Sequence, residues 1–175
     1  MNPSRGFKLI FSTSVGDKTT TTDANNFNED NASSTQYRIN ASLGSYYTVN
    51  SGSIIYAGFN TGLLQNSQGL FLNDLFRTGG LQSIRGFNEN EFFASKYLVT
   101  NFEYRFLLEE ASYFFMFFDQ SYLGYDIANV SFRDHPSGIG AGFKLKTNGG
   151  IFNLVYGIGR RNGQRFSFNL SKIQK

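Results

Sequence analysis

The chain has no cysteine, no tryptophan and no long apolar run. Without cysteine it has neither a disulfide framework nor a thiolate metal site. Its longest apolar run, residues 113–118, is far shorter than the roughly 20 residues that a membrane-spanning helix requires. These absences exclude a disulfide scaffold and a helical membrane protein.

Residues for catalysis or for nucleic-acid binding are equally scarce. The single histidine, His135, follows Asp134 in a polar stretch and has no nucleophile elbow or metal-ligand spacing near it. Glu109 and Glu110 are adjacent, so in a strand they face opposite sides and cannot share a site. The net charge of +3 comes from Lys and Arg scattered among acidic residues, with no block that could follow a phosphate backbone. We expect no enzyme, no metal or cofactor, and no nucleic-acid partner.

Aromatic residues and period-two alternation are abundant instead. Phe and Tyr make up 17% of the chain, while Gly, Ser, Thr and Asn supply many polar positions. Apolar and polar residues alternate from end to end, which is typical of β-strands with one apolar face. The pattern predicts an all-β, antiparallel protein of about eight strands, at residues 6–16, 36–49, 53–64, 96–107, 112–122, 138–146, 152–159 and 165–175.

Long polar connections alternate with short turns between these strands. Long loops are predicted at about 18–35 and 65–95, and a further loop carries Arg133 to Pro136. Tight turns are predicted after Asn50 and at Asn148-Gly149. This alternation is typical of the two sides of an outer-membrane barrel, so we expect one partial barrel domain over residues 1–175.

The apolar face could meet lipid, a second sheet or a lipocalin-like interior, and alternation alone does not distinguish these. Three features favour lipid. The strands are about ten residues long, Tyr and Phe lie near strand ends, and the opposite face bears Gly, Asn, Ser, Lys, Arg and Glu. We therefore predict a transmembrane β-barrel in contact with outer-membrane lipid.

One segment carries a family resemblance. Residues 79–87, Gly-Gly-Leu-Gln-Ser-Ile-Arg-Gly-Phe, closely resemble the signature loop of the BamA/TamA-type outer-membrane assembly barrels, the bacterial surface antigen family. Residues 2–7, 117–119, 138–142 and 149–156 are similar to other motifs of that family, in the same order. The resemblance implies the second half of a barrel of roughly sixteen strands in the bacterial outer membrane.

The resemblance also implies a lumenal ion pair. In that family the long loop folds back into the barrel, and its Arg meets an Asp of the wall. Carried onto this sequence, the loop motif is Arg85, Gly86 and Phe87, and the partner of Arg85 is Asp119. Glu103, on the polar face of the strand at 96–107, is a weaker candidate partner. A guanidinium can form bidentate bonds to a carboxylate, and glycine accepts the backbone angles of a folded-back loop. The alternative is a solvated Arg-Gly-Phe turn.

The leading functional hypothesis is a barrel that assembles, inserts or translocates outer-membrane proteins, with client proteins and assembly accessory proteins as partners. Its physical basis is β-augmentation, in which an open strand edge pairs with an incoming strand. Two alternatives stay open: a barrel that anchors an upstream enzyme or binding module, and a small pore or lipid-binding barrel.

Overall fold

The computed structural model describes residues 5–20, 32–109, 111–127, 130–147, 150–161 and 165–170, and within residues 165–170 only the backbone. These residues form antiparallel strands, short connections and one turn of 3-10 helix, so the predicted all-β class is confirmed. In the described part of the chain, no helix is long and apolar enough to cross a membrane.

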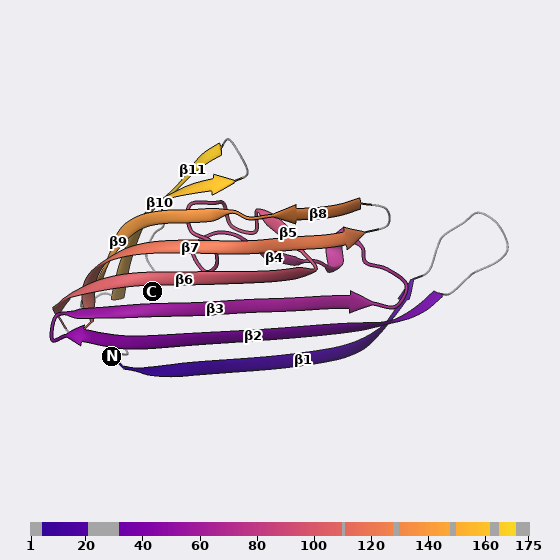
Figure 1. Cartoon of the computed structure of the whole chain (residues 1–175), viewed down its shortest axis with the longest axis horizontal. Helices are drawn as coiled ribbons and strands as arrows, with labels where there is room; N and C mark the ends of the chain where they lie inside the picture. The colour runs from indigo at the N-terminus through magenta and orange to yellow at the C-terminus, as the bar shows by residue number, and fades with distance from the viewer. Residues whose placement is uncertain are drawn as a thin grey trace.

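The main sheet contains the eight predicted strands in their predicted order. Each strand pairs antiparallel with the next one along the path, and β1 and β11 form the two edges of the described sheet (Figure 1). The strands are β1 (Gly6–Thr20), β2 (Ala32–Asn50), β3 (Ser53–Asn66), β6 (Lys96–Glu109), β7 (Ser112–Ile127), β9 (Ser137–Thr147), β10 (Gly150–Arg161) and β11 (Arg165–Leu170). The last part of the predicted eighth strand, 171–175, lies outside the described residues.

A ninth strand, β8 (Val130–Asp134), lies where the sequence predicts a loop, so that prediction is wrong for Arg133 and Asp134. Strands β8 and β9 both pair with β7 in one register, with Leu123 opposite Asp134 and Gln120 opposite Ser137. They are therefore one strand interrupted at residues 135–136. Proline lacks the N–H that a ladder requires, which explains the interruption at Pro136.

The loop predicted at about 18–35 is shorter than expected, because β1 continues to Thr20 and β2 begins at Ala32. Residues 21–31 lie outside the described part of the chain. The polar ends of both strands pair through backbone groups, and Thr35 Oγ1 donates a hydrogen bond to Asp17 Oδ1 at 3.0 Å across the ladder. Polar side chains are compatible with a strand end that faces water, so a polar stretch alone overestimates the loop.

The second long connection has structure of its own. Strand β3 continues to Asn66, and the segment that follows contains the 3-10 turn η1 (Leu72–Asp74) and a small hairpin of β4 (Phe76–Thr78) and β5 (Phe92–Ala94). We call residues 67–95 the inner loop and the sheet face that it covers the inner face. Figure 1 shows β4 and β5 lying against the sheet beside β6 and β7.

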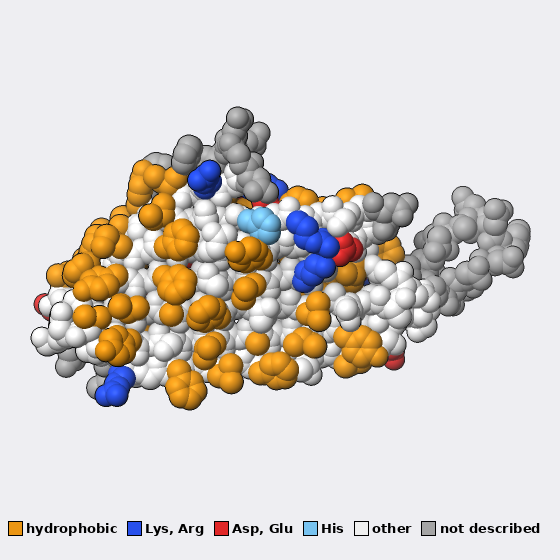
Figure 2. Space-filling model, in the orientation of Figure 1, with side chains coloured by type: hydrophobic (Ala, Val, Ile, Leu, Met, Phe, Trp, Pro, Cys, Tyr) orange, Lys and Arg blue, Asp and Glu red, His pale blue; other side chains and the backbone are white. Residues whose placement is uncertain are grey.

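The opposite, outer face carries exposed apolar side chains. Phe7 is 78% exposed and Val15 is 67% exposed, and many more large hydrophobics of β2, β3, β6, β7 and β9 are also uncovered. Figure 2 shows such side chains spread over the visible face of the sheet. A water-soluble monomer rarely exposes an apolar surface this extensive.

The inner loop covers the inner face over β6 and β7, and the packed core lies between the loop and these strands. Ile84 and Phe87 of the loop are buried against Val99 and Leu123 of the wall, in a cluster that includes Phe92 and Ala94. Burying one such side chain stabilises the fold by about 1.5–3 kcal/mol. The inner loop is thus a packed part of the fold.

Strand β7 is apolar on both faces, of which the inner one is packed and the outer one is exposed. Tyr113, Phe115 and Phe117 point inward and are buried in a second cluster with Val155, on which Leu81 of the inner loop packs. Phe114, Met116 and Phe118 point outward and stay exposed. The inner apolar series ends at Asp119, where the inner loop supplies a cation.

Candidate functional site

The backbone of the inner loop turns sharply on both sides of Arg85. Ser83 N donates to Gly80 O, and Gly80 N donates to Ile84 O, both at 3.1 Å. Gly86 has φ +91°, a left-handed conformation that favours glycine. These turns direct the Arg85 side chain toward β6 and β7.

Asp119 of β7 receives Arg85 in a bidentate contact. Arg85 Nη2 lies 2.6 Å from Asp119 Oδ1, and Arg85 Nε lies 2.8 Å from Asp119 Oδ2. The backbone N–H of Arg85 donates to Oδ2 at 2.9 Å, and Asn101 Nδ2 donates to Oδ1 at 2.9 Å. A carboxylate accepts about four hydrogen bonds, so this fully buried Asp119 is satisfied.

Glu103 of β6 completes a four-residue ionic cluster. Arg85 Nη1 donates to Glu103 Oε1, and Arg105 binds the other oxygen through Nε at 2.7 Å and Nη2 at 2.6 Å. Two guanidinium groups therefore balance two carboxylates in a water-poor region. Removing one member of such a set leaves a buried charge without its counterion.

The charges around Arg85 favour its protonated form. Burial by itself would lower the pKa of Arg85, but the hydrogen bond and charge of Asp119, together with the charge of Glu103, raise the pKa above its ordinary value. The guanidinium also stacks on Phe117, with Cζ 3.9 Å from the ring centroid. Such stacking adds a cation–π attraction, and the compact ammonium group of a lysine could not stack on the ring in this planar way.

Glycines on the inner faces of β9 and β10 make room for the loop motif. Across the strands, Asp119 lies opposite Gly138, and Gly138 lies opposite Gly159. A Cβ at Gly138 would overlap the carbonyl oxygen of Arg85, and one at Gly159 would lie 2.5 Å from the carbonyl oxygen of Gly86. The backbone of the loop therefore lies directly on a wall without side chains.

Phe87 fixes the third position of the motif. It is 2% exposed and packs edge-to-face on Phe92, with ring centroids 4.9 Å apart. Its ring also occupies the space above Gly159, where a Cβ would lie 2.6 Å from Phe87 Cζ. Arg85, Gly86 and Phe87 thus each have a distinct contact with the wall: ionic, backbone and apolar.

A second attachment holds the other end of the inner loop. Lys18 Nζ of β1 lies 2.7 Å from Asp74 Oδ1, and Arg38 Nη2 of β2 donates to Asp74 O at 2.9 Å. Lys18 also lies over Phe71, and Arg38 over Phe76. Burial favours a raised pKa for Asp74, but hydrogen bonds from Lys18 and from the backbone of Phe71 lower its pKa below 3.8. The loop therefore joins β1 and β2 to β6 and β7.

All five residues predicted for the site are brought together. Arg85 contacts both Asp119 and Glu103, and Gly86 and Phe87 continue the same segment along the wall. His135, for which no functional role was predicted, is exposed and packs on Tyr122.

Sequence reasoning missed Asn101, the glycines of β9 and β10, and the attachment of Lys18 and Arg38 to Asp74. A signal for the glycines was present, because glycine recurs at every second residue over 138–142 and again at 157 and 159. Strand register was needed to see that these positions face the loop. Among the described residues there is no group of three or more side chains that could hold a metal ion.

Two comparisons with known proteins address the family. The model of the Omp85 superfamily domain matches residues 1–173. No curated protein sequence matches the chain significantly.

Proposed function

Because this chain belongs to the Omp85 superfamily, we propose that it assembles, inserts or translocates proteins in the bacterial outer membrane, using the inner loop to hold the wall in its working arrangement. At the family level, these proteins are outer-membrane barrels that act on other outer-membrane proteins together with accessory proteins. In this proposal the exposed apolar face meets lipid, and the covered inner face lines the lumen.

The observation that carries the proposal is the buried cluster of Arg85, Asp119 and Glu103. It attaches the loop to β6 and β7, while the adjacent Gly86 lies on Gly159 of β10. One short motif therefore contacts β6, β7, β9 and β10, and β10 pairs with the edge strand β11. An incoming client strand would pair with open backbone groups at such an edge, and the loop would set the position of the strands beside it.

The experiment replaces Arg85 in the full-length protein and measures the insertion of client barrels. Arg85→Ala should abolish most insertion while the protein still reaches the outer membrane. Arg85→Lys should also be impaired, because an ammonium group cannot bind Asp119 and Glu103 in the same planar geometry.

Arg77→Ala is the matched control. Arg77 belongs to the same loop and lies over Phe93, but it is exposed and outside the ionic cluster. Wild-type client insertion by Arg85→Ala would contradict the proposed role of the cluster, whereas an absence of client insertion by the wild type would leave membrane anchoring as the function of the barrel. Equal defects in Arg77→Ala and Arg85→Ala would show that the loop acts without a special role for the cluster.

A further inference from the structure

A charged cluster interrupts the apolar outer face near the ends of β6 and β7. Arg133 of β8 donates from Nη2 to both oxygens of Asp126, at 2.9 and 3.0 Å, and Lys96 Nζ lies 3.2 Å from Asp126 Oδ2. All three side chains are about half exposed. Figure 2 shows Lys or Arg side chains beside the single histidine, on the same face as the hydrophobic side chains.

The cluster has more positive than negative charge. Lys96 and Arg133 share the single carboxylate of Asp126, so one positive charge remains without a protein counterion within the group. A charged group on a lipid-facing strand is costly near the middle of a bilayer and is tolerated close to the interface. The position at the strand ends and the excess positive charge both suit an anionic group at the membrane surface.

An amphipathic hollow lies directly beside these cations. Its volume is about 340 Å³, and its wall combines Lys96, Arg133 and His135 with the apolar side chains of Leu63, Leu98 and Tyr122. Gly124 forms part of the wall, and a Cβ there would lie 2.9 Å from Arg133 Cδ. The absence of a side chain at Gly124 allows Arg133 to lie flat across β7.

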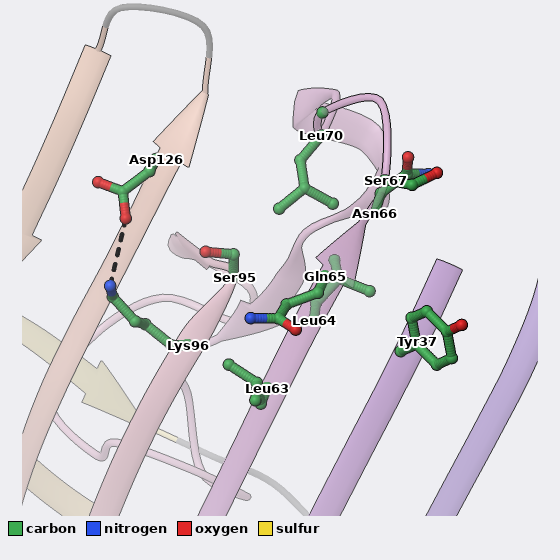
Figure 3. A pocket seen from close by; sticks show the side chains of 11 residues that line it. Tyr37, Leu63, Leu64, Gln65, Asn66, Ser67, Leu70, Ser95, Lys96 and Asp126 are labelled. Carbon is green, nitrogen blue, oxygen red and sulfur yellow. Dashed lines mark hydrogen bonds and ion pairs between the residues drawn. The ribbon is translucent and has the colours of Figure 1, made fainter. Parts of the chain in front are cut away.

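A second hollow shares Leu63 and Lys96 with the first. Figure 3 shows it between Tyr37 and the Lys96–Asp126 pair, with Leu70 of the inner loop above it. Its volume is about 390 Å³, and Gln65 and Asn66 add polar groups. Lys96 therefore lines both hollows, and each hollow combines polar groups with apolar side chains.

The cluster lies on the side of the sheet with the long connections. The inner loop leads into β6 at Lys96, whereas the short connections between β2 and β3 and between β6 and β7 lie at the other ends of the strands. In outer-membrane barrels the short turns face the periplasm and the long loops face outward. The cations would then meet the headgroups of the outer leaflet.

We propose that Lys96 and Arg133 bind the phosphorylated headgroup of an outer-leaflet lipid, whose acyl chains lie along Leu63, Leu98 and Tyr122. A phosphate oxygen accepts charge-assisted hydrogen bonds from both cations, and basic pockets on membrane proteins select anionic lipids in this way. The lipid site lies on the outer face and does not involve the Arg85 cluster. The lipid-site proposal and the proposed function can therefore be tested independently.

The test uses the full-length protein in phosphatidylcholine nanodiscs that contain a small fraction of phosphatidic acid. Retention of phosphatidic acid is measured by native mass spectrometry for the wild type, Lys96→Gln and Arg133→Gln. Each substitution removes one cation and should weaken retention about fivefold relative to phosphatidylcholine. Lys146→Gln is the control, because Lys146 is an exposed cation near the opposite strand ends.

Lys96→Gln is the decisive variant. Arg133 also donates hydrogen bonds to the carbonyls of Tyr125 and Phe132, so the loss of the Arg133 side chain can disturb β8. An unchanged gel shift between heated and unheated samples shows that each variant is folded. Equal retention by the wild type, Lys96→Gln and Lys146→Gln would overturn the proposal. Displacement of phosphatidic acid by an equal concentration of inorganic phosphate would also overturn it, because the site would then select a soluble anion.

Discussion

Arg85 reaches across the inner face to Asp119 and binds both oxygens of that carboxylate, at 2.6 and 2.8 Å. The two residues are 34 positions apart, one in the inner loop and the other in β7. Because Asp119 is fully buried, the pair can be maintained only while the loop stays against the wall.

Replacing Asp119 by Asn should therefore destabilise the protein. The amide keeps the shape of the side chain but leaves the buried Arg85 with only one carboxylate, and breaking a buried pair costs about 3–5 kcal/mol. The temperature at which the folded gel band disappears should fall clearly. Asp126→Asn, on the exposed outer face, is the control and should change it little. Equal unfolding temperatures for the two variants would contradict the importance of the pair.

A methyl group at Gly138 should displace the loop. In Gly138→Ala the new Cβ would collide with the backbone of Arg85, and overpacking of this kind costs about 1–3 kcal/mol. Because the native chain has no cysteine, Ser83→Cys can report loop position through its rate of thiol labelling. Labelling should accelerate in Gly138→Ala. It should stay unchanged in Gly16→Ala, where a Cβ meets nothing within 4 Å, and the same rate in both variants would refute the contact.

The Lys18–Asp74 attachment should weaken in acid. The pKa of Asp74 is lower in the folded protein than its ordinary value of 3.8, so its contribution to stability is present above pH 3.8 and is lost as the pH falls through the folded pKa. The thermal midpoint, followed by tyrosine fluorescence, should decrease over that acidic range. Asp74→Asn should remove part of this decrease, whereas Glu109→Gln, near the opposite strand end, should not. A wild-type acid profile in Asp74→Asn would exclude the attachment as its cause.

Two adjacent residues of β1 test which face meets lipid. Phe11 lies on the outer face and is 64% exposed, while Ser12 points to the inner side. An arginine at a lipid-facing position near the bilayer centre costs about 2–4 kcal/mol. Phe11→Arg should therefore reduce the amount of folded protein in the outer membrane, and Ser12→Arg should be tolerated. A stronger defect in Ser12→Arg would reverse the assignment of the faces.

The sequence predicted the strands because period-two alternation depends only on each strand's own environment. It identified the outward apolar positions of β2, such as Ile39 and Leu43, without knowledge of any partner strand. The family resemblance, and not the alternation, predicted the pairing of Arg85 with Asp119, because alternation within a strand does not indicate contacts between distant segments. Glu103 was a candidate because alternation placed it on the polar face of its strand. The family itself is confirmed by the match over residues 1–173.

The missed features all depend on neighbouring strands. Strand β8 was missed because Pro136 interrupts the alternation, although the pairing with β7 continues in register on both sides of the interruption. The glycine wall requires the register of β7, β9 and β10, which places Gly138 and Gly159 in one row with Asp119. The Lys18–Asp74 attachment joins a strand to a loop whose path only the fold determines.

The most direct test of the account is fractionation of cells that express the full-length protein, followed by electrophoresis of heated and unheated membrane samples. The account predicts that the protein is in the outer membrane, is extracted only by detergent, and migrates faster when unheated because the barrel stays folded. A protein that is soluble without detergent and shows no such shift would contradict it, because the exposed apolar face would then have to pack against protein instead of lipid.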